Sequence, residues 1–414
     1  MDLLRVARDV ASAADEIDRL GDDVDWEAHR HVAGRTAMLE IASQSASALR
    51  DALTAWVAWL TVVRVAQPAA LRARAARRET RAVVRLERET SLTLDETVAA
   101  LIASKSPNEA RACFAALAEF APLASTEHAL RETRVEAFRR LGIDDVAERF
   151  CGVGESKLAR SARQFLVETN DLARDLVKKK DALDRYPLDV DARLARGATE
   201  GWPSRLTWRS AAALLTGFEM RATMRADAPR ALGAASFARA LGAIGAAFQS
   251  IATTAEPFAE RIAPLRARER RTGFVFASAL AEPALFTRVL GLSRGKASDQ
   301  ARVLAIAFLL DARFRAMRVA LRPNPSADRE EITALGVGAP LPSPWPLARD
   351  EDLADVVALF SSLAIVDALR AREGDDWFRN PRAFGALRAL ATSSVALDDG
   401  APAALARRFE GVLA

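Results

Sequence analysis

Histidine is scarce in this chain of 414 residues, which contains only His29, His31 and His128. Side chains two positions apart on a helix point about 200° away from each other, so His29 and His31 could bind one metal ion only from a loop. Asp25 and Glu27 lie next to them and would complete a ligand set that zinc accepts. A pair of surface histidines explains the same pattern, and we therefore predict no metal site and no other cofactor.

Two further segments look like chemical sites but are explained as helix starts. The segment 291–298 (GLSRGKAS) has only three residues between its glycines, and Ala297 stands where a phosphate-binding loop needs a hydroxyl for magnesium. We predict a helix that begins after Gly295. The second segment is a run of carboxylates, which complement the positive end of a helix dipole: Asp350, Glu351, Asp352 and Asp355.

Five arginines recur at steps of three and four residues, which would place them along one face of a helix in the region 33–88, with a break near Pro68. They are Arg74, Arg77, Arg81, Arg85 and Arg88. Glutamates lie among them and aromatic residues do not, so the pattern favours a solvated face. Contact with an acidic partner through this face is the alternative. The net charge is only +4, and we do not expect nucleic-acid binding.

The cysteines and the apolar segments indicate a reduced, cytoplasmic protein. Cys113 and Cys151 have no second cysteine at metal-binding or redox spacing. The first 21 residues mix charged with apolar residues, which predicts an amphipathic helix and not a secretory leader. The segment 55–66 is strongly apolar, but it is too short to cross a bilayer and contains Arg64. No membrane span is expected.

Helical periodicity runs through nearly the whole chain, and alternating strand patterns are almost absent, so we predict an all-α protein. The segment 187–203 combines prolines, glycines and charges between long helical stretches. It predicts a connection between an N-terminal helical subdomain (1–186) and a C-terminal one (204–414), which could enclose a cleft. A second irregular segment, 322–349, is rich in proline and has the length typical of functional loops.

A helical segment predicted at 232–254 carries the run Gly242-Ala-Ile-Gly-Ala-Ala-Phe-Gln249. This run resembles the signature helix of the oligoendopeptidase F and thimet oligopeptidase family of zinc metallopeptidases, which has the form His-Glu-x-Gly-His, followed in several members by Ala-Phe-Gln. In that register Gly242 and Ala246 stand where the two histidines would be, and Ala243 stands where the glutamate would be. A second register, beginning at Arg239, also fits the frame. Neither register holds a zinc ligand.

Two later segments carry the same resemblance. The run 274–282 is similar to the family's segment with the third ligand, and apolar Val275 stands near the ligand position. Glu282 matches only a later acid of that run. The segment 374–382 resembles the end of the catalytic domain in some members. Family membership would imply a large helical protein that encloses a substrate channel, with Arg239, Gln249 and Glu282 lining whatever cleft remains.

Three functions stay open at this point. The first is a catalytically inactive relative of these peptidases that binds a protein or peptide through its cleft or helical surface. The second is a helical assembly or adaptor subunit without peptidase ancestry, which would use surfaces such as the arginine face or the segment 322–349. The third is an enzyme with acid, hydroxyl or cysteine chemistry, for which Glu219, Glu282 or Cys151 would lie in a cleft with a perturbed pKa.

Overall fold

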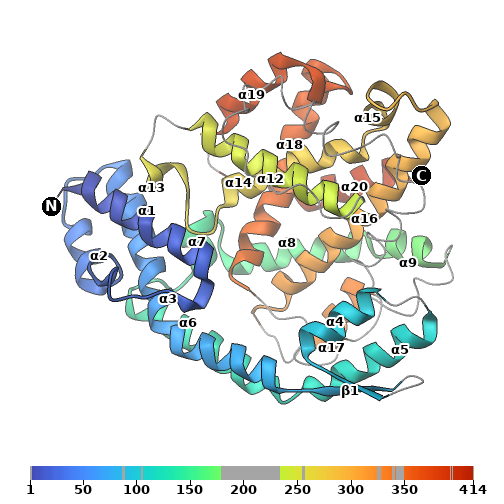
Figure 1. Ribbon diagram of the computed structural model, residues 1–414. Helices are drawn as coiled ribbons and strands as arrows, with labels where there is room; N and C mark the ends of the chain where they lie inside the picture. Colours follow the sequence, from blue (N-terminus) through green and yellow to red (C-terminus); the bar gives the residue numbers. More distant parts are fainter. Residues whose placement is uncertain are drawn as a thin grey trace.

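A computed structural model describes residues 2–85, 89–103, 106–178, 234–253, 257–323, 328–337, 341, 349–391, 393 and 395–413. The protein is all-α, as the periodicity predicted, and is shown in Figure 1. The earlier helices are α1 (Leu3–Leu20), α2 (Arg35–Ala42), α3 (Ala48–Glu79), α4 (Leu94–Ala103), α5 (Pro107–Ala116), α6 (Leu123–Arg140), α7 (Val146–Cys151), α8 (Glu155–Glu168) and α9 (Asn170–Lys178). The later ones are α12 (Ala234–Ala252), α13 (Phe258–Arg261), α14 (Ala267–Ser278), α15 (Pro283–Arg288), α16 (Arg294–Ala320), α17 (Arg329–Val337), α18 (Glu351–Glu373), α19 (Pro381–Ala391) and α20 (Ala401–Leu413).

The one hairpin among the described residues corrects the prediction of a long arginine-bearing helix. Helix α3 runs through Pro68 without ending and stops at Glu79, after which β1 (Ala82–Arg85) pairs with the antiparallel strand β2 (Glu89–Leu92). The expected break is absent because the residues that follow the proline, Ala69, Ala70 and Ala73, are buried by packing that outweighs the helix-breaking effect of proline. The valines of β1 favour a strand over a helix.

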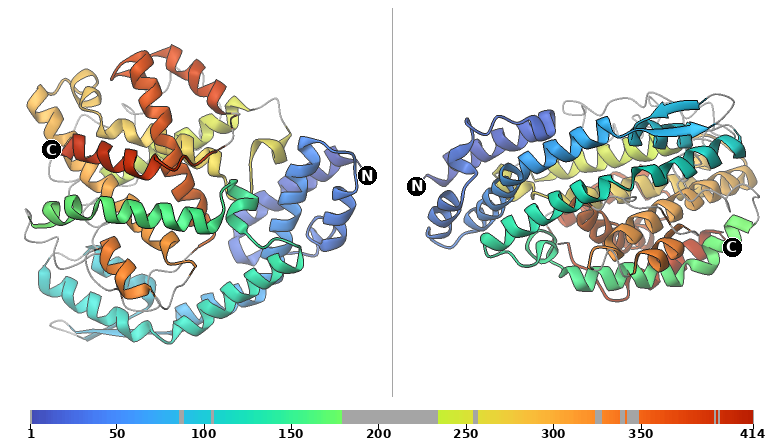
Figure 2. Two further views of the ribbon diagram at one scale, coloured as in Figure 1. Left: turned by 180° about the vertical axis from the view of Figure 1, so that it is seen from behind. Right: turned by 90° about the horizontal axis from the view of Figure 1, so that it is seen from below.

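Helices α3 and α6 pack together along one edge of the molecule, as the three views in Figures 1 and 2 show. Aromatic rings join them at one end, where Trp59 lies 6.0 Å from Phe138 and 5.6 Å from Phe150, measured between ring centroids. Phe150 belongs to α7, so aromatic side chains from α3, α6 and α7 pack together here.

Helix α8 packs against three helices from the end of the chain, α16, α18 and α20. Its Phe165 is fully buried and lies 5.6 Å from Phe360 of α18 and 6.4 Å from Phe409 of α20, between ring centroids. The predicted connection 187–203 lies outside the described residues. The helices on its two sides share a hydrophobic core through these contacts.

A second hydrophobic core lies around α12, α14 and α19, in the upper part of Figure 1. Phe248 of α12 lies 5.7 Å from Phe276 of α14 and 6.1 Å from Phe384 of α19, between ring centroids. None of the helices in the described ranges is long and apolar enough to cross a membrane.

Candidate functional site

Helices α12 and α14, which carry the peptidase-like runs, are in direct backbone contact. A Cβ atom placed on Gly245 would lie 2.5 Å from the carbonyl oxygen of Thr272 and 2.9 Å from the Cα of Gly273. A Cβ on Gly273 would lie 2.8 Å from the carbonyl oxygen of Gly242. Real Cβ atoms do not approach backbone atoms so closely, so glycine is required at both positions. The two helices face each other without a cleft at this crossing.

The positions that correspond to zinc ligands in the resemblance lie beside this crossing. Val275 is completely buried, Gly242 and Ala246 are half-buried, and Ala243 is exposed on α12. Gln249 is also completely buried, and its side-chain oxygen accepts a hydrogen bond of 2.8 Å from the Thr272 hydroxyl. The crossing is therefore closed by packing and by a polar contact one turn away.

Arg239 lies on α12, but its side chain is outside the described residues, as is the whole of Glu219. Among the residues that the structure describes, no group of three or more His, Cys, Asp or Glu side chains could hold a metal ion.

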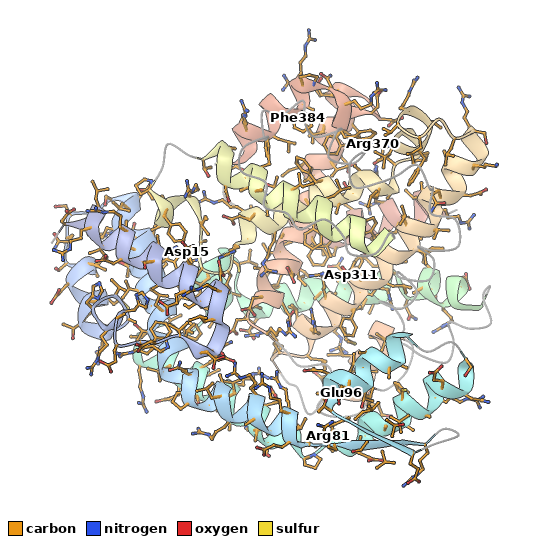
Figure 3. The ribbon with its side chains drawn as sticks, in the orientation of Figure 1. Asp15, Arg81, Glu96, Asp311, Arg370 and Phe384 are labelled. Carbon is orange, nitrogen blue, oxygen red and sulfur yellow. The ribbon has the colours of Figure 1, made fainter. Side chains whose placement is uncertain are left out.

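A cavity of about 90 Å³ lies on another side of α14, between α16, α18 and α20. Apolar side chains make up most of its wall, including Phe274, Phe308 and Phe409. Glu282 and Asp311 supply carboxyl groups, and Asp311 is labelled on α16 in Figure 3. Apolar pockets with a few convergent polar groups are the usual form of small-molecule sites.

Glu282 is almost fully buried at this cavity and is held by two arginines. Its Oε1 accepts a hydrogen bond of 2.7 Å from Arg408 and lies 3.6 Å from the nearest guanidinium nitrogen of Arg370. Burial raises the pKa of the Glu282 carboxyl above its usual range, and the two arginines counteract this rise only in part. Arg370 is labelled in Figure 3.

Glu269 is a second buried carboxyl group, and it lies on α14 one turn before Thr272 and Gly273. Both of its oxygens are buried without a hydrogen-bond partner in the described part of the chain. Burial raises its pKa, although Arg266, Arg268 and other neighbouring charges favour the ionised form. The folded protein therefore favours the protonated acid more strongly than the unfolded chain does.

Replacing Glu269 by methionine is expected to increase the free energy of unfolding at pH 7 by about 1–3 kcal/mol, because it removes a buried polar group without partners. The raised pKa sets the sign of the pH dependence. The wild type loses stability as pH rises from below the acid's unfolded pKa toward its folded pKa, since only the unfolded chain ionises readily. The gain from the substitution should therefore shrink toward pH 4, as measured by urea unfolding across pH. Equal stability of Glu269→Gln and wild type at every pH would contradict this account.

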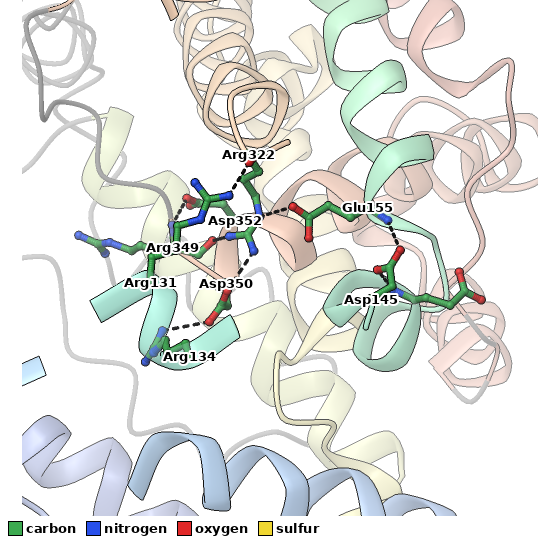
Figure 4. Close-up of polar contacts among 9 residues, drawn as sticks. Arg131, Arg134, Asp145, Glu155, Arg322, Arg349, Asp350 and Asp352 are labelled. Carbon is green, nitrogen blue, oxygen red and sulfur yellow. Dashed lines mark hydrogen bonds and ion pairs between the residues drawn. The ribbon is translucent and has the colours of Figure 1, made fainter. Parts of the chain in front are cut away.

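A network of buried charges surrounds Arg322 at the end of α16, shown in Figure 4. The Arg322 guanidinium lies 3.2 Å from a carboxylate oxygen of Glu155 and 3.1 Å from one of Asp350, and it donates a hydrogen bond of 3.1 Å to the carbonyl oxygen of Arg349. Arg134 of α6 binds the other oxygen of Asp350 at 3.0 Å. The network joins α6, α8, α16 and the start of α18.

The interpretation of the acidic run as a helix start holds for Asp352, whose carboxylate accepts a hydrogen bond of 2.8 Å from the backbone N–H of Arg349, but the run also forms ion pairs that it did not predict. The side chain of Asp350 makes no capping hydrogen bond, and Asp352 and Asp355 bind arginines of α14 and α16. The first and last residues of the segment 322–349 meet in the network, because Arg322 binds the backbone of Arg349. Sequence analysis missed these pairs, and the only signal was a set of carboxylates too large for capping alone.

The arginine face expected on one helix does not form, because α3 ends before it is complete. Each described member pairs with a different acid: Arg74 with Asp23, Arg77 with Glu127, Arg81 with Glu96, and Arg85 with Glu89. Arg81 and Glu96 are labelled beside the hairpin in Figure 3. Arg88 lies outside the described residues. These arginines serve to join elements of the N-terminal half.

The remaining candidates from the sequence lie in ordinary packing. His29 is buried and bonds to Glu16 at 2.7 Å, whereas His31 lies 3.1 Å from Asp9, so the two histidines contact different carboxylates of α1. Burial raises the pKa of the Cys151 thiol to about 12, which leaves almost no thiolate at neutral pH. This thiol is therefore a poor nucleophile.

Comparison with solved structures supports the fold that the sequence resemblance predicted. No family model matches the chain, and no curated protein matches it. Its backbone is similar to that of a crystal structure described as an oligoendopeptidase F from Bacillus anthracis strain Ames, with 12% sequence identity and a TM-score of 0.53. The alignment covers 100% of this chain and 96% of that chain. The fold that the resemblance predicted is thereby confirmed, and at this identity the likeness extends to the fold alone.

Proposed function

We propose that this peptidase-like fold serves binding in the present chain, which does not cleave peptides. The observation that supports the proposal is the crossing of α12 and α14. Gly242, Ala246 and Val275, which take the ligand positions in the resemblance, have no side-chain atom that can bind zinc. The backbones of the two helices touch beside them, where Gly245 meets Thr272 and its neighbour.

The chemistry of zinc peptidases explains why these residues matter. Such a site needs protein ligands from nitrogen, sulfur or oxygen atoms and an open position for the attacking water. A carboxylate close to that water must accept its proton. In the register of the resemblance, Ala243 stands at the position of this carboxylate, so that position has no side chain that could accept the proton. Two polar side chains lie near the crossing: Gln249, which is neutral and bonded to Thr272, and Glu269, whose buried carboxyl group lies one turn before Thr272 on α14.

Zinc analysis and peptide hydrolysis test this proposal together. Purified protein without an affinity tag is expected to carry far less than one zinc per chain, even after incubation with zinc and removal of the excess. Quenched fluorescent peptides of varied sequence should be cleaved no faster than in buffer. A variant in which His29, His31 and His128 are replaced by alanine controls for adventitious zinc, because it removes every imidazole of the chain. Stoichiometric zinc in this variant, with hydrolysis that a chelator stops, would overturn the proposal.

A further inference from the structure

The cavity beside α14 presents hydrogen-bond acceptors from several helices. Ser278 donates its hydroxyl proton to the carbonyl oxygen of Val275 at 2.7 Å, and Ser362 donates to that of Leu359 at 2.8 Å. Both serines line the cavity wall, and each hydroxyl oxygen keeps lone pairs that can accept a further hydrogen bond. The polar atoms that these serines offer to a ligand are therefore acceptors.

The two carboxyl groups of the cavity have the same character. Asp311 uses Oδ2 to bind Arg315 at 2.7 Å, and Glu282 uses Oε1 to bind Arg408. Within the described ranges, the second oxygen of each carboxyl group has no hydrogen-bond partner. A ligand that donates hydrogen bonds would therefore find acceptors on α16 and next to η7 (Ala279–Ala281).

The charges around the Glu282 end favour a cation. The two arginines that hold Glu282 also bind other acids: Arg408 lies 3.3 Å from Asp367, and Arg370 lies 2.9 Å from Asp375. Three carboxylates thus share two guanidinium groups, which leaves one negative charge. At the Asp311 end the charges are balanced. Arg315 binds both Asp311 and Asp355, and Arg270 also binds Asp355, so two guanidinium groups face two carboxylates.

The size and the walls of the cavity limit what this cation can be. A volume of about 90 Å³ holds roughly six to nine water-sized units, which corresponds to a small organic molecule. The rings of Phe274, Phe308 and Phe409 offer apolar surface to the body of a ligand. A bare metal ion would leave these rings without a partner, and an anion would face two carboxyl groups, Glu282 and Asp311, against the one guanidinium group of the wall, Arg408.

We propose that this cavity binds a small primary amine with a compact apolar body. Its ammonium group donates to the free carboxylate oxygen of Glu282, at the end of the cavity where negative charge is in excess, and its apolar part packs against the phenylalanines. The inference rests on the proposed binding function, for which it names the ligand class. The zinc and hydrolysis measurements test the binding function, and the experiments below test the amine ligand. One proposal can therefore fail without deciding the other.

Titration calorimetry with benzylamine tests the inference against two probes of matched size. Benzylamine is expected to bind and to raise the melting temperature of the full chain. Ethylbenzene, which lacks the charge, should bind at least about tenfold more weakly, and phenylacetate should not bind, because a charge-assisted hydrogen bond is worth at least that factor. Equal binding of benzylamine and ethylbenzene would overturn the amine assignment. So would an absence of benzylamine binding.

Variants locate the binding at this cavity. Glu282→Gln keeps the shape of the side chain and should weaken benzylamine at least about tenfold. Asp51→Asn removes one negative charge from an exposed residue of α3 that is neither on the cavity wall nor among the charges around Glu282, and it should leave binding unchanged. Ser362→Leu fills the cavity and should abolish binding while the helical circular dichroism is retained. Binding that survives Ser362→Leu, or that falls equally in Glu282→Gln and Asp51→Asn, would place the amine elsewhere and overturn the inference.

Discussion

Replacing Arg322 by methionine is expected to lower the free energy of unfolding by about 3–5 kcal/mol, because the substitution leaves the buried carboxylate of Asp350 and the partly buried one of Glu155 short of a partner. Asp350 keeps only Arg134, and Glu155 loses its ion pair. Burial by itself would lower the pKa of the Arg322 guanidinium, but Asp350 and Glu155 reverse this effect, so the side chain is charged in the folded protein. Urea unfolding followed by circular dichroism measures the change.

Arg139→Met is the matched control for this experiment. Its side chain is 65% exposed and pairs with the half-exposed Glu136 at 3.1 Å on the surface of α6. Exposed pairs of this kind contribute about 0–1 kcal/mol. If the variant at Arg322 is no less stable than the control variant, the network around Arg322 does not hold α6, α8, α16 and α18 together as described.

The second large effect is expected at the glycine crossing. Gly245→Ala would place a methyl group 2.5 Å from the backbone oxygen of Thr272, so α12 and α14 must move apart. Gly242→Ala has room, because its Cβ would lie 3.8 Å from the carbonyl oxygen of Gly273. Both substitutions occur inside the same helix and gain the same helix propensity, which therefore cancels in the comparison. We expect Gly245→Ala to be less stable than Gly242→Ala by about 3 kcal/mol.

Thermal and urea unfolding of the two alanine variants provide the measurement. Gly273→Ala, whose Cβ would lie 2.8 Å from the carbonyl oxygen of Gly242, should resemble Gly245→Ala because it widens the same crossing from the other helix. Two alanine variants of α12 with equal stability would mean that the helices do not touch at Gly245, and would remove the observation that supports a binding function.

Much of the fold follows from local features of the sequence. Helical periodicity predicted the fold class, and glycines and prolines marked many helix ends. The failure at Pro68 has a clear reason, since the apolar residues on both sides of this proline are buried against other helices, and burial is decided by distant segments. The arginine face failed because spacing alone cannot tell where a helix stops.

The candidate sites were less accessible to sequence analysis. The family resemblance pointed to the α12 and α14 segments, and it drew attention to Glu282, which the structure places at a cavity. The cavity itself depends on which faces of four helices meet, and alanines such as Ala277 and Ala305 give no sign of this on their own. Arg322 and its partner Glu155 lie far apart in sequence, and nothing in the sequence distinguishes a buried arginine from an exposed one.

The packing of Phe165 has a consequence for the order in which the chain can fold during its synthesis. Helix α8 leaves the ribosome long before α18 and α20, whose Phe360 and Phe409 cover that ring. Until those helices are made, α8 presents its apolar side to solvent or to chaperones, since contacts between distant segments form last. Helix α8 can therefore complete its packing only after the end of the chain has been synthesised.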